Sequence, residues 1–522
     1  MAHINRSFVR MRVFILLMSL TLLVPAPPVP VHAAPRTAPP AIAPAARAAI
    51  ATHSSVEVLV ILQAQAKLPT LPAYADKATR GRIIVRVLQT YAKHTQAPLR
   101  DWLESQAVSY RAFYIVNALL IEADGPLLDE LAARPEIAAI TTNPAVVAPL
   151  AIPEPEPAAG SLLVPAQPPW GIEHIGAPKV WALGYRGQRV VVAGQDTGYD
   201  WSHPALKSQY RGWDGITVDH DYNWHDAIHA TGGLCPADSP EPCDDHGHGT
   251  HTMGTIVGQA PGDTPIGVAP GAQWIGCRNM HRGIGTPASY AECFEFFLAP
   301  YPVGGTPEEG EPARAPHVIN NSWACTPAEC TEPEHIPFLE GVVNAVRAAG
   351  IMVVASAGNS GPACDTVLHP PAIYSASTTV GATDDEDNIA FFSSRGDAAG
   401  LQKPQLTAPG VSVHSSTLGG GYATLQGTSM AAPHVTGAAA LLWSARPDLR
   451  GNVAATELLL TSTAVPLTSS ECGSGPDALP NPVYGWGRLD ALAAIEAGLP
   501  ILRNRLYFPL LIREADKVHC IP

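Results

Sequence analysis

Hydrophobic residues follow two different patterns along the chain, separated by a proline-rich stretch at residues 144–169. In the first part, short apolar runs typical of strands occupy residues 56–62, 114–122 and 137–142. Apolar residues with helical spacing occupy residues 80–94, 99–108 and 125–132. This mixture of strands and helices predicts a small α+β domain over residues 55–143.

The second part, residues 170–498, alternates apolar strands with helices. The runs at 189–193 and 351–355 have the continuous apolar character of strands that are buried on both faces. The segment 338–349 predicts a helix that stops at Gly350. This alternation predicts an α/β fold, with a mainly parallel sheet and helices on both of its faces.

Alanine and proline dominate two connecting segments, residues 35–54 and residues 144–169. Proline fixes φ and has no amide donor, so both segments are expected to be extended linkers that build no core. An exposed and extended segment at 144–169 is also a natural place for proteolytic processing.

The first 34 residues have the order of a secretory signal peptide. Three arginines within the first twelve residues precede an apolar run over residues 13–24, and small residues follow at Ala33 and Ala34. A membrane anchor is the alternative, but the run is shorter than the ~20 residues that span a bilayer. We therefore expect removal of residues 1–34 and a secreted, extracellular protein without a transmembrane segment.

Charge and cysteine content limit the possible partners. The net charge of -14 argues against nucleic acids and anionic membranes, which are bound through clustered lysines and arginines. All nine cysteines follow the signal peptide, so export would permit disulfides, and the pairs Cys235 with Cys243 and Cys325 with Cys330 suit short surface loops. The odd number leaves at least one thiol free or bonded to another chain. No zinc-type spacing occurs, so no metal site is expected.

Four short motifs contain residues typical of nucleophilic catalysis. In chain order they are Asp196-Thr197-Gly198, His248-Gly249-Thr250-His251, Ala357-Gly358-Asn359-Ser360-Gly361 and Gly427-Thr428-Ser429-Met430-Ala431-Ala432-Pro433-His434. Asp196 follows an apolar run, which places it at the carboxyl end of a parallel strand, where open α/β sheets form their ligand crevices. Taken alone, the Asp motif also fits an ordinary turn or an aspartic protease.

Together these motifs resemble those of the subtilisin-like serine proteases, or subtilases, and most closely their bacillopeptidase F-like branch. The resemblance covers residues 170–497, and its order Asp, His, Ser differs from the orders of chymotrypsin-like and α/β-hydrolase enzymes. Further matching segments are His203-Pro204-Ala205-Leu206, Ile266-Gly267-Val268-Ala269-Pro270-Gly271-Ala272, Asn320-Asn321-Ser322-Trp323 and Tyr484-Gly485-Trp486-Gly487. The resemblance implies a subtilisin-like fold and a serine endopeptidase that cleaves proteins or peptides through an acyl-enzyme.

The resemblance assigns a role to each catalytic position. Ser429 is the nucleophile, His248 is the base that removes its proton, and Asp196 is the carboxylate that orients the imidazole. The side-chain amide of Asn359 and the backbone N–H of Ser429, at the start of a helix, are expected to stabilise the oxyanion. His251, the second histidine of its motif, is expected to be structural.

By the same resemblance, two segments line the substrate cleft. They are Asn321, Ser322 and Trp323, expected to pair with the substrate backbone, and Ser356, Ala357 and Gly358, expected on the opposite wall of the pocket. Backbone pairing gives affinity with little side-chain selectivity, so broad specificity is expected. The chain departs from the family pattern at Ala324, Cys325, Gln195 and Gln405, and neither glutamine is expected to touch the chemistry.

The position and element order of residues 55–143 resemble the inhibitory propeptide of these proteases. We expect this unit to assist folding, to occupy the active cleft of its own chain and to be removed near the 144–169 linker. A permanently attached accessory domain is the alternative. The chemistry requires no cofactor; many relatives bind calcium, but the acidic residues 384–387 predict a solvated loop rather than a calcium site. A monomer is expected, and no role is assigned to the tail at 499–522.

Three other functions compete with peptide hydrolysis. A lipase or esterase is disfavoured, because Gly427-Thr428-Ser429-Met430-Ala431 lacks the second glycine of a nucleophile elbow. A catalytically inactive scaffold that binds peptides and a peptide ligase that uses the same acyl-enzyme both agree with the sequence.

Overall fold

The computed structural model describes residues 41–72, 75–143, 146–147, 152–153, 167–230, 233–325, 332–397 and 399–498. The expected signal peptide at 1–34, most of the linker at 144–169, Cys330 and the tail at 499–522 lie outside the described residues. Among the helices that are described, none is both long enough and apolar enough to cross a membrane.

The N-terminal unit contains a five-stranded sheet in the order β1-β5-β2-β4-β3. Its elements are β1 (Ala41–Ile42), α1 (Pro44–Thr52), β2 (Val56–Leu62), α2 (Lys77–Ser105), β3 (Tyr110–Phe113), β4 (Ala118–Ala123), α3 (Gly125–Ala132) and β5 (Ile137–Thr142). Leucines from α2 and α3 pack against the apolar faces of β2, β4 and β5, which gives this unit a core of its own. The predicted α+β unit is confirmed, and β2, α3 and β5 have the predicted bounds.

Residues 44–52, predicted to be linker, form α1 instead. Alanine is the strongest helix former, and Pro44 occupies the first turn, where its missing N–H costs nothing. Ala46 is fully buried in the core of the unit, so a segment rich in alanine and proline does contribute to a core here.

Two other elements of the unit differ from the sequence prediction. The helices expected at 80–94 and 99–108 are one continuous helix, α2, which contains Pro98. Buried leucines on both sides of this proline, among them Leu88 and Leu99, hold the two halves against apolar surfaces. The strand expected at 114–122 begins only at Ala118, because a turn separates β3 from β4.

The catalytic part is built on a seven-stranded parallel sheet in the order β18-β17-β16-β15-β8-β12-β9. Its strands are β8 (Val191–Asp196), β9 (Trp224–Asp226), β12 (Gln273–Arg278), β15 (Val318–Asn321), β16 (Met352–Ser356), β17 (Thr378–Thr383) and β18 (Leu406–Pro409). Its helices are α4 (Trp170–His174), α5 (Ala177–Ala182), α6 (His248–Val257), α7 (Pro287–Leu298), α8 (His335–Ala348), α9 (Thr428–Ala445), α10 (Val453–Ser462) and α11 (Ala491–Gly498).

Short antiparallel pairings surround this sheet. Their strands are β10 (Gln259–Ala260), β11 (Thr264–Pro265), β13 (Met280–His281), β14 (Ile284–Gly285), β19 (Val413–Ser416) and β20 (Tyr422–Gln426). Two strands of the linker join them: β6 (Val146–Val147) pairs with β14, and β7 (Ile152–Pro153) pairs with β20.

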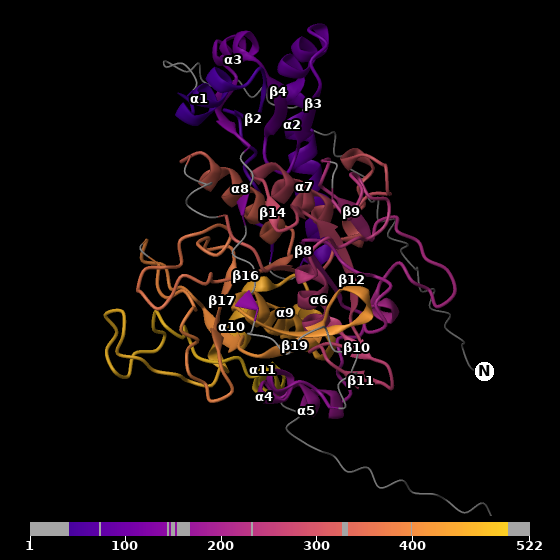
Figure 1. Ribbon diagram of the computed structural model, residues 1–522, viewed down its shortest axis with the longest axis vertical. Coiled ribbons are helices and arrows are strands. Elements are labelled where there is room, and N and C mark those ends of the chain that lie inside the picture. Colours follow the sequence, from indigo (N-terminus) through magenta and orange to yellow (C-terminus); the bar gives the residue numbers. More distant parts are fainter. Residues whose placement is uncertain are drawn as a thin grey trace, which may run out of the picture.

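Helices cover both faces of the seven-stranded sheet, as predicted (Figure 1). Side chains of α7 and α8 pack on Ile275, Ile319 and Val353, whereas those of α6 and α9 pack on Val192 and Val354 from the other face. The strand order reverses between β8 and β15, since the chain first builds outward through β12 and then returns to build outward from β15. Such a switch point opens a crevice at the carboxyl ends of the strands.

The N-terminal unit rests on α7 and α8 (Figure 1). Arg111 of this unit forms an ion pair with Glu292 of α7. Glu295, one turn further along α7, accepts the backbone N–H groups of Tyr114 and Ile115 at 2.7 and 2.8 Å. We call this contact between the N-terminal unit and helices α7 and α8 the seam. One hydrophobic cluster continues across it, so the two parts share a buried interface.

Disulfides tie several loops to the catalytic part. The predicted pair Cys235–Cys243 is confirmed. Two further pairs, which sequence spacing did not identify, are Cys277–Cys293 and Cys364–Cys472. Cys325 is also disulfide-bonded, and Cys330, its expected partner, lies outside the described residues.

Candidate active site

Asp196 and His248 are joined directly at the carboxyl end of the sheet. Asp196 is the last residue of β8 and His248 is the first residue of α6. His248 Nδ1 donates to Asp196 Oδ1 at 2.7 Å, and the same oxygen accepts the backbone N–H of Thr197 at 2.8 Å. Both side chains are almost completely buried. This bond keeps the proton on Nδ1 and leaves Nε2 as the basic nitrogen of the ring.

Asp244, which the sequence analysis did not single out, organises the start of α6. Its carboxylate accepts the Thr197 hydroxyl at 2.9 Å, the Gly247 N–H at 2.8 Å and the Thr250 hydroxyl at 2.6 Å. Gly249 allows the first turn of α6 to lie close to the segment that follows β8, because a Cβ at position 249 would lie 2.1 Å from the carbonyl oxygen of residue 198. An acidic residue shortly before a helix is a recognisable sequence signal for this role.

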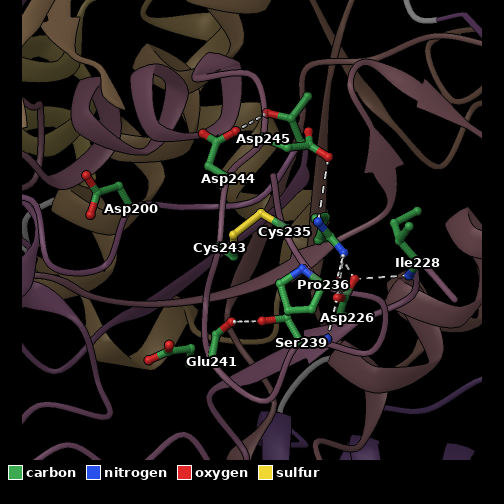
Figure 2. The surroundings of a disulfide bond; sticks show 12 residues. Asp200, Asp226, Ile228, Cys235, Pro236, Ser239, Glu241, Cys243, Asp244 and Asp245 are labelled. Atoms are coloured by element: carbon green, nitrogen blue, oxygen red, sulfur yellow. Dashed lines mark hydrogen bonds and ion pairs between the residues drawn. A yellow bond between two sulfur atoms is a disulfide. The ribbon is translucent and has the colours of Figure 1, made fainter. Parts of the chain in front are cut away.

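A disulfide-bonded loop leads into this region (Figure 2). Asp226, at the end of β9, forms a bidentate ion pair with Arg278 of β12, at 2.9 and 2.7 Å, and both side chains are buried. Arg278 also donates to the Pro236 carbonyl at 2.7 Å and lies 3.6 Å from Asp245. The loop closed by the Cys235–Cys243 bond is therefore connected to the segment that precedes His248.

Ser429 lies in the first turn of α9, and α9 packs against α6, which begins with His248. Its hydroxyl donates to the Ser322 carbonyl at 3.1 Å, and the Ser322 hydroxyl donates back to the Ser429 carbonyl at 2.8 Å. Within the described residues, His248 Nε2 has no hydrogen-bond partner. The helix α9 directs its first unpaired N–H groups to this region, which favours negative charge there.

Asn359 lies in the loop after β16, beside the start of α9. Its Oδ1 accepts both the backbone N–H and the hydroxyl of Thr428, at 2.9 and 3.0 Å. The Thr428 hydroxyl in turn accepts the Gly358 N–H at 3.1 Å. These bonds fix the side-chain amide of Asn359 with its Oδ1 toward Thr428 and its Nδ2 directed away from Thr428. Sequence reasoning identified Asn359 but not Thr428, whose role depends on this contact between distant segments.

The residues expected at the substrate edge use their side chains inside the protein. Asn321 donates to the Val354 carbonyl at 2.9 Å and is fully buried. Trp323 is also buried and stacks on Tyr290 of α7, with 3.6 Å between ring centroids and an angle of 4°. The Ser322 side chain is bonded to the Ser429 carbonyl. These side chains are therefore engaged within the protein, and the backbone is the part of this segment that would pair with a peptide.

The residues expected on the opposite wall of the pocket lie at the end of β16 and just after it. Ser356 is the last residue of this strand, and Ala357 donates its N–H to the Val380 carbonyl at 2.9 Å. Gly358 follows with φ of +103°, a conformation that side chains rarely adopt. This turn brings the chain from β16 to Asn359.

The other predicted features of the site are a structural histidine and a solvated acidic loop. Burial lowers the pKa of His251 to about 3, and the ring donates to the carbonyls of Val413 and Ala423, both at 3.1 Å.

In the acidic segment at residues 384–387, Asp384 accepts the N–H groups of Glu386 and Asn388 and so closes its own loop. Across the part of the chain that is described, no cluster of three or more metal-ligating side chains is found.

Comparison with known proteins agrees with this geometry. The family model described as "Subtilase family" matches residues 187–487. Bacillopeptidase F of Bacillus subtilis is 36% identical over 452 residues, which are 83% of this chain and 30% of that protein. Subtilisin Savinase of Lederbergia lenta is 33% identical over 327 residues, 62% of this chain and 98% of that protein. The chain belongs to the subtilase family and is a serine-type endopeptidase.

Proposed function

We propose that the protein is a secreted endopeptidase that hydrolyses proteins through an acyl-enzyme on Ser429. The observation that carries this proposal is the 2.7 Å hydrogen bond between His248 and Asp196, at the start of a helix that packs against α9. Membership of the subtilase family supports the same reaction. Secretion is proposed from the signal-like first 34 residues.

The reaction begins when the Ser429 hydroxyl attacks the peptide carbonyl while His248 Nε2 removes its proton. Rotation of the hydroxyl away from the Ser322 carbonyl, about a single side-chain bond, prepares this step. Asp196 stays ionised and stabilises the imidazolium. His248 then protonates the leaving amine, and a water activated by the same ring hydrolyses the ester on Ser429.

The oxyanion that forms in each step requires donors that are already in place. The Nδ2 group of Asn359 and the backbone N–H of Ser429 are the proposed pair. Two bonds from Thr428 to the carbonyl side of the Asn359 amide support this assignment, because they turn the donor side of the amide away from Thr428.

We propose broad specificity, because the edge at residues 321–323 presents backbone rather than side chains. Backbone pairing selects an extended conformation and is nearly independent of sequence. A peptide or protein substrate would add a strand there, with Ser356, Ala357 and Gly358 on the other side of the residue before the scissile bond.

The N-terminal unit, which includes the predicted residues 55–143, is proposed to be an inhibitory propeptide, and the linker at 144–169 the place of its removal. Two pairings support this idea, since β6 joins β14 and β7 joins β20, the strand that ends three residues before Ser429. The second of these pairings lies on the strand that leads into α9. The bonds from Glu295 and Glu292 to the unit would keep it bound after the linker is cut.

Ser429→Ala tests the proposal. The variant is expected to lower the rate of casein cleavage by about 10⁴- to 10⁶-fold, since it removes the nucleophile. Asn359→Ala is expected to cost less, about 10²- to 10³-fold in kcat, the magnitude found for such a donor in a subtilisin. Sequencing the N-terminus of the mature protein locates the processing site in the same preparation.

Near-normal cleavage by pure Ser429→Ala protein would refute the acyl-enzyme. Failure of a fluorophosphonate to label correctly processed parent protein would favour the inactive, peptide-binding scaffold. Mass spectrometry of the products separates hydrolysis from ligation, because only ligation joins two peptides.

A further inference from the structure

Three buried amide side chains form a row beneath the catalytic ends of the strands. They belong to Asn279, just after β12, to Gln195 of β8 and to Asn321 of β15, and each residue is fully buried. Asn279 Nδ2 donates to Gln195 Oε1 at 3.1 Å. Gln195 Nε2 then donates to Asn321 Oδ1 at 2.6 Å. The row thus connects three neighbouring strands through side chains alone.

The direction of this row is fixed at one end by the backbone. Asn321 Nδ2 lies 3.2 Å from the Ile319 carbonyl and 2.9 Å from the Val354 carbonyl, and a carbonyl oxygen can only accept. Asn321 must therefore present its oxygen to Gln195, which must donate to it and accept from Asn279. Because Val354 belongs to β16, the row spans four adjacent strands.

Two of these four strands, β8 and β15, end beside proposed catalytic groups. Gln195 precedes Asp196 in β8, so the two side chains project to opposite faces of the sheet. Asn279 also donates its backbone N–H to the Asp196 carbonyl at 3.0 Å. Asn321 precedes Ser322, whose carbonyl accepts the Ser429 hydroxyl.

The surroundings of the row are apolar, which makes an amide at position 195 costly unless its bonds are made. Ala193, Cys277 and Ile319 lie in the hydrophobic cluster on this face of the sheet. An apolar side chain would fill the same space without directional bonds and would tolerate small shifts between strands. An amide at position 195 that both donates and accepts instead specifies one relative position of the strand ends.

We propose that Gln195 is a positioning residue whose amide fixes the spacing between Asp196, at the end of β8, and Ser322, which follows β15 and bonds to Ser429. From the sequence, Gln195 is not expected to touch the chemistry, and the amide row connects it instead to the strand ends that hold Asp196 and Ser322. The inference rests on the proposed function of Asp196, His248 and Ser429.

Gln195→Met tests this role, because methionine keeps the length and approximate volume of the side chain but makes neither hydrogen bond. The kcat of the mature enzyme on a peptide anilide is expected to fall about tenfold, since a 1 Å misplacement of reacting groups can cost about 10²-fold. KM should change by less than about twofold, because the substrate-binding backbone is retained. The rate of Ser429 labelling by a fluorophosphonate should fall by the same factor as kcat.

Asn279→Ala gives a second and milder measurement if Gln195→Met does not mature. It removes one bond of the row and is expected to lower kcat about threefold. Combined with Gln195→Met it should cause no further loss of kcat, because the Asn279 side chain acts through Gln195.

Gln405→Met is the matched control. Gln405 also makes a bond between strands, accepting the Thr379 N–H at 2.6 Å, but at the amino ends of β17 and β18. Both methionine variants should lose thermal stability, and only Gln195→Met should lose kcat. An unchanged kcat in Gln195→Met and Asn279→Ala, or an equal loss in Gln405→Met, would overturn the inference. Ser429→Ala, measured in parallel, reports separately on the proposed function.

Discussion

Two ion pairs between an arginine and a carboxylate in this molecule use the same chemistry in different surroundings. Arg278 and Asp226 lie within the catalytic part, and their side chains are 0% and 1% exposed. Arg111 and Glu292 connect the N-terminal unit to α7, and their side chains are 37% and 4% exposed. The first pair is enclosed by one fold, whereas the second pair lies at the boundary between two.

The partners of the two acids sharpen this difference. Asp226 also accepts the N–H groups of Ile228 and Ser239, at 3.0 and 2.7 Å, so its bonds all come from its own domain. Glu292 also accepts from His225 at 2.7 Å and from His229 at 3.1 Å, both on the catalytic part. Glu292 therefore keeps partners when Arg111 leaves, and its pair can open without stranding a buried charge.

The pKa values at the seam follow from these contacts. Burial by itself raises the pKa of Glu292, but Arg111 and the two imidazoles lower it by more, so its net pKa lies well below the ordinary value. The hydrogen bond to Glu292 raises the pKa of His229 to about 8. The seam thus contains an imidazole with a pKa of about 8 beside an ion pair that can dissociate.

Asp226→Ala breaks the enclosed pair and should have the largest effect. The variant leaves the buried Arg278 with the longer ion pair to Asp245, at 3.6 Å, in place of the bidentate one, and breaking a buried pair typically costs about 3–5 kcal/mol. The melting temperature of the mature enzyme, inhibited to prevent autolysis, should fall by roughly 10 °C. Calorimetry measures this change.

Asp448→Ala is the control for this experiment. Asp448 pairs with Arg446 at the surface, at 2.5 Å, and is largely exposed. Exposed pairs contribute about 0–1 kcal/mol, so this variant should melt within a few degrees of the parent. Equal losses in the two variants would show that enclosure does not distinguish the pairs.

Arg111→Glu breaks the pair at the seam and should have an intermediate effect. It places a new carboxylate against Glu292, and loss of such a pair across an interface typically costs about 2–5 kcal/mol. The N-terminal unit should then bind the processed enzyme at least about tenfold more weakly, with unchanged kcat once it is gone. Size-exclusion chromatography of the processed enzyme measures the bound fraction.

The same reversal of charge at Arg47 provides the control. Arg47 lies in the N-terminal unit and pairs at 3.4 Å with the exposed Asp129 of that unit. Arg47→Glu should leave the bound fraction unchanged. A similar loss in both variants would mean that general charge, and not the contact with Glu292, governs docking.

Local patterns allowed much of the fold to be predicted. β2 and α3 have the expected bounds because each is defined by apolar spacing within its own sequence. α1 was missed because its alanines bury only through contact with a sheet formed later in the chain. The pair Cys277–Cys293 was likewise unpredictable, since it depends on how α7 lies on β12.

In the candidate site, too, local sequence predicts some residues, whereas contacts between distant segments could not be predicted. Motifs identified Asp196, His248 and Asn359, and their catalytic roles stay predictions until the variants are measured. Asp244 and Thr428, which hold these residues, were not singled out, because their function consists of bonds to distant segments. Sequence therefore pointed to the reacting groups but not to the contacts that support them.

Glu295 offers the finest test of the seam, because its charge depends on docking. Burial raises its pKa to about 8, although the N–H groups of Ile115 and Tyr114 lower it in part. When the N-terminal unit leaves, α7 becomes exposed and the pKa should return toward its ordinary value of 4.5. The docked state then binds more protons between these values, so docking should be strongest below about pH 4.5 and weaken as the pH rises to about 8.

Glu295→Gln removes this titration while retaining an oxygen that accepts both N–H groups. At pH 8 the variant should hold the N-terminal unit about 10³-fold more tightly than the parent, and at pH 4.5 the two should bind within about twofold of each other. Arg111, Glu292, His225 and His229 are unchanged in both proteins, so the difference between the two pH profiles reports on Glu295 alone. If the profiles stay parallel from pH 4.5 to 8, the carboxyl is already solvated when docked, and the seam gains its pH dependence from the pair at Glu292 instead.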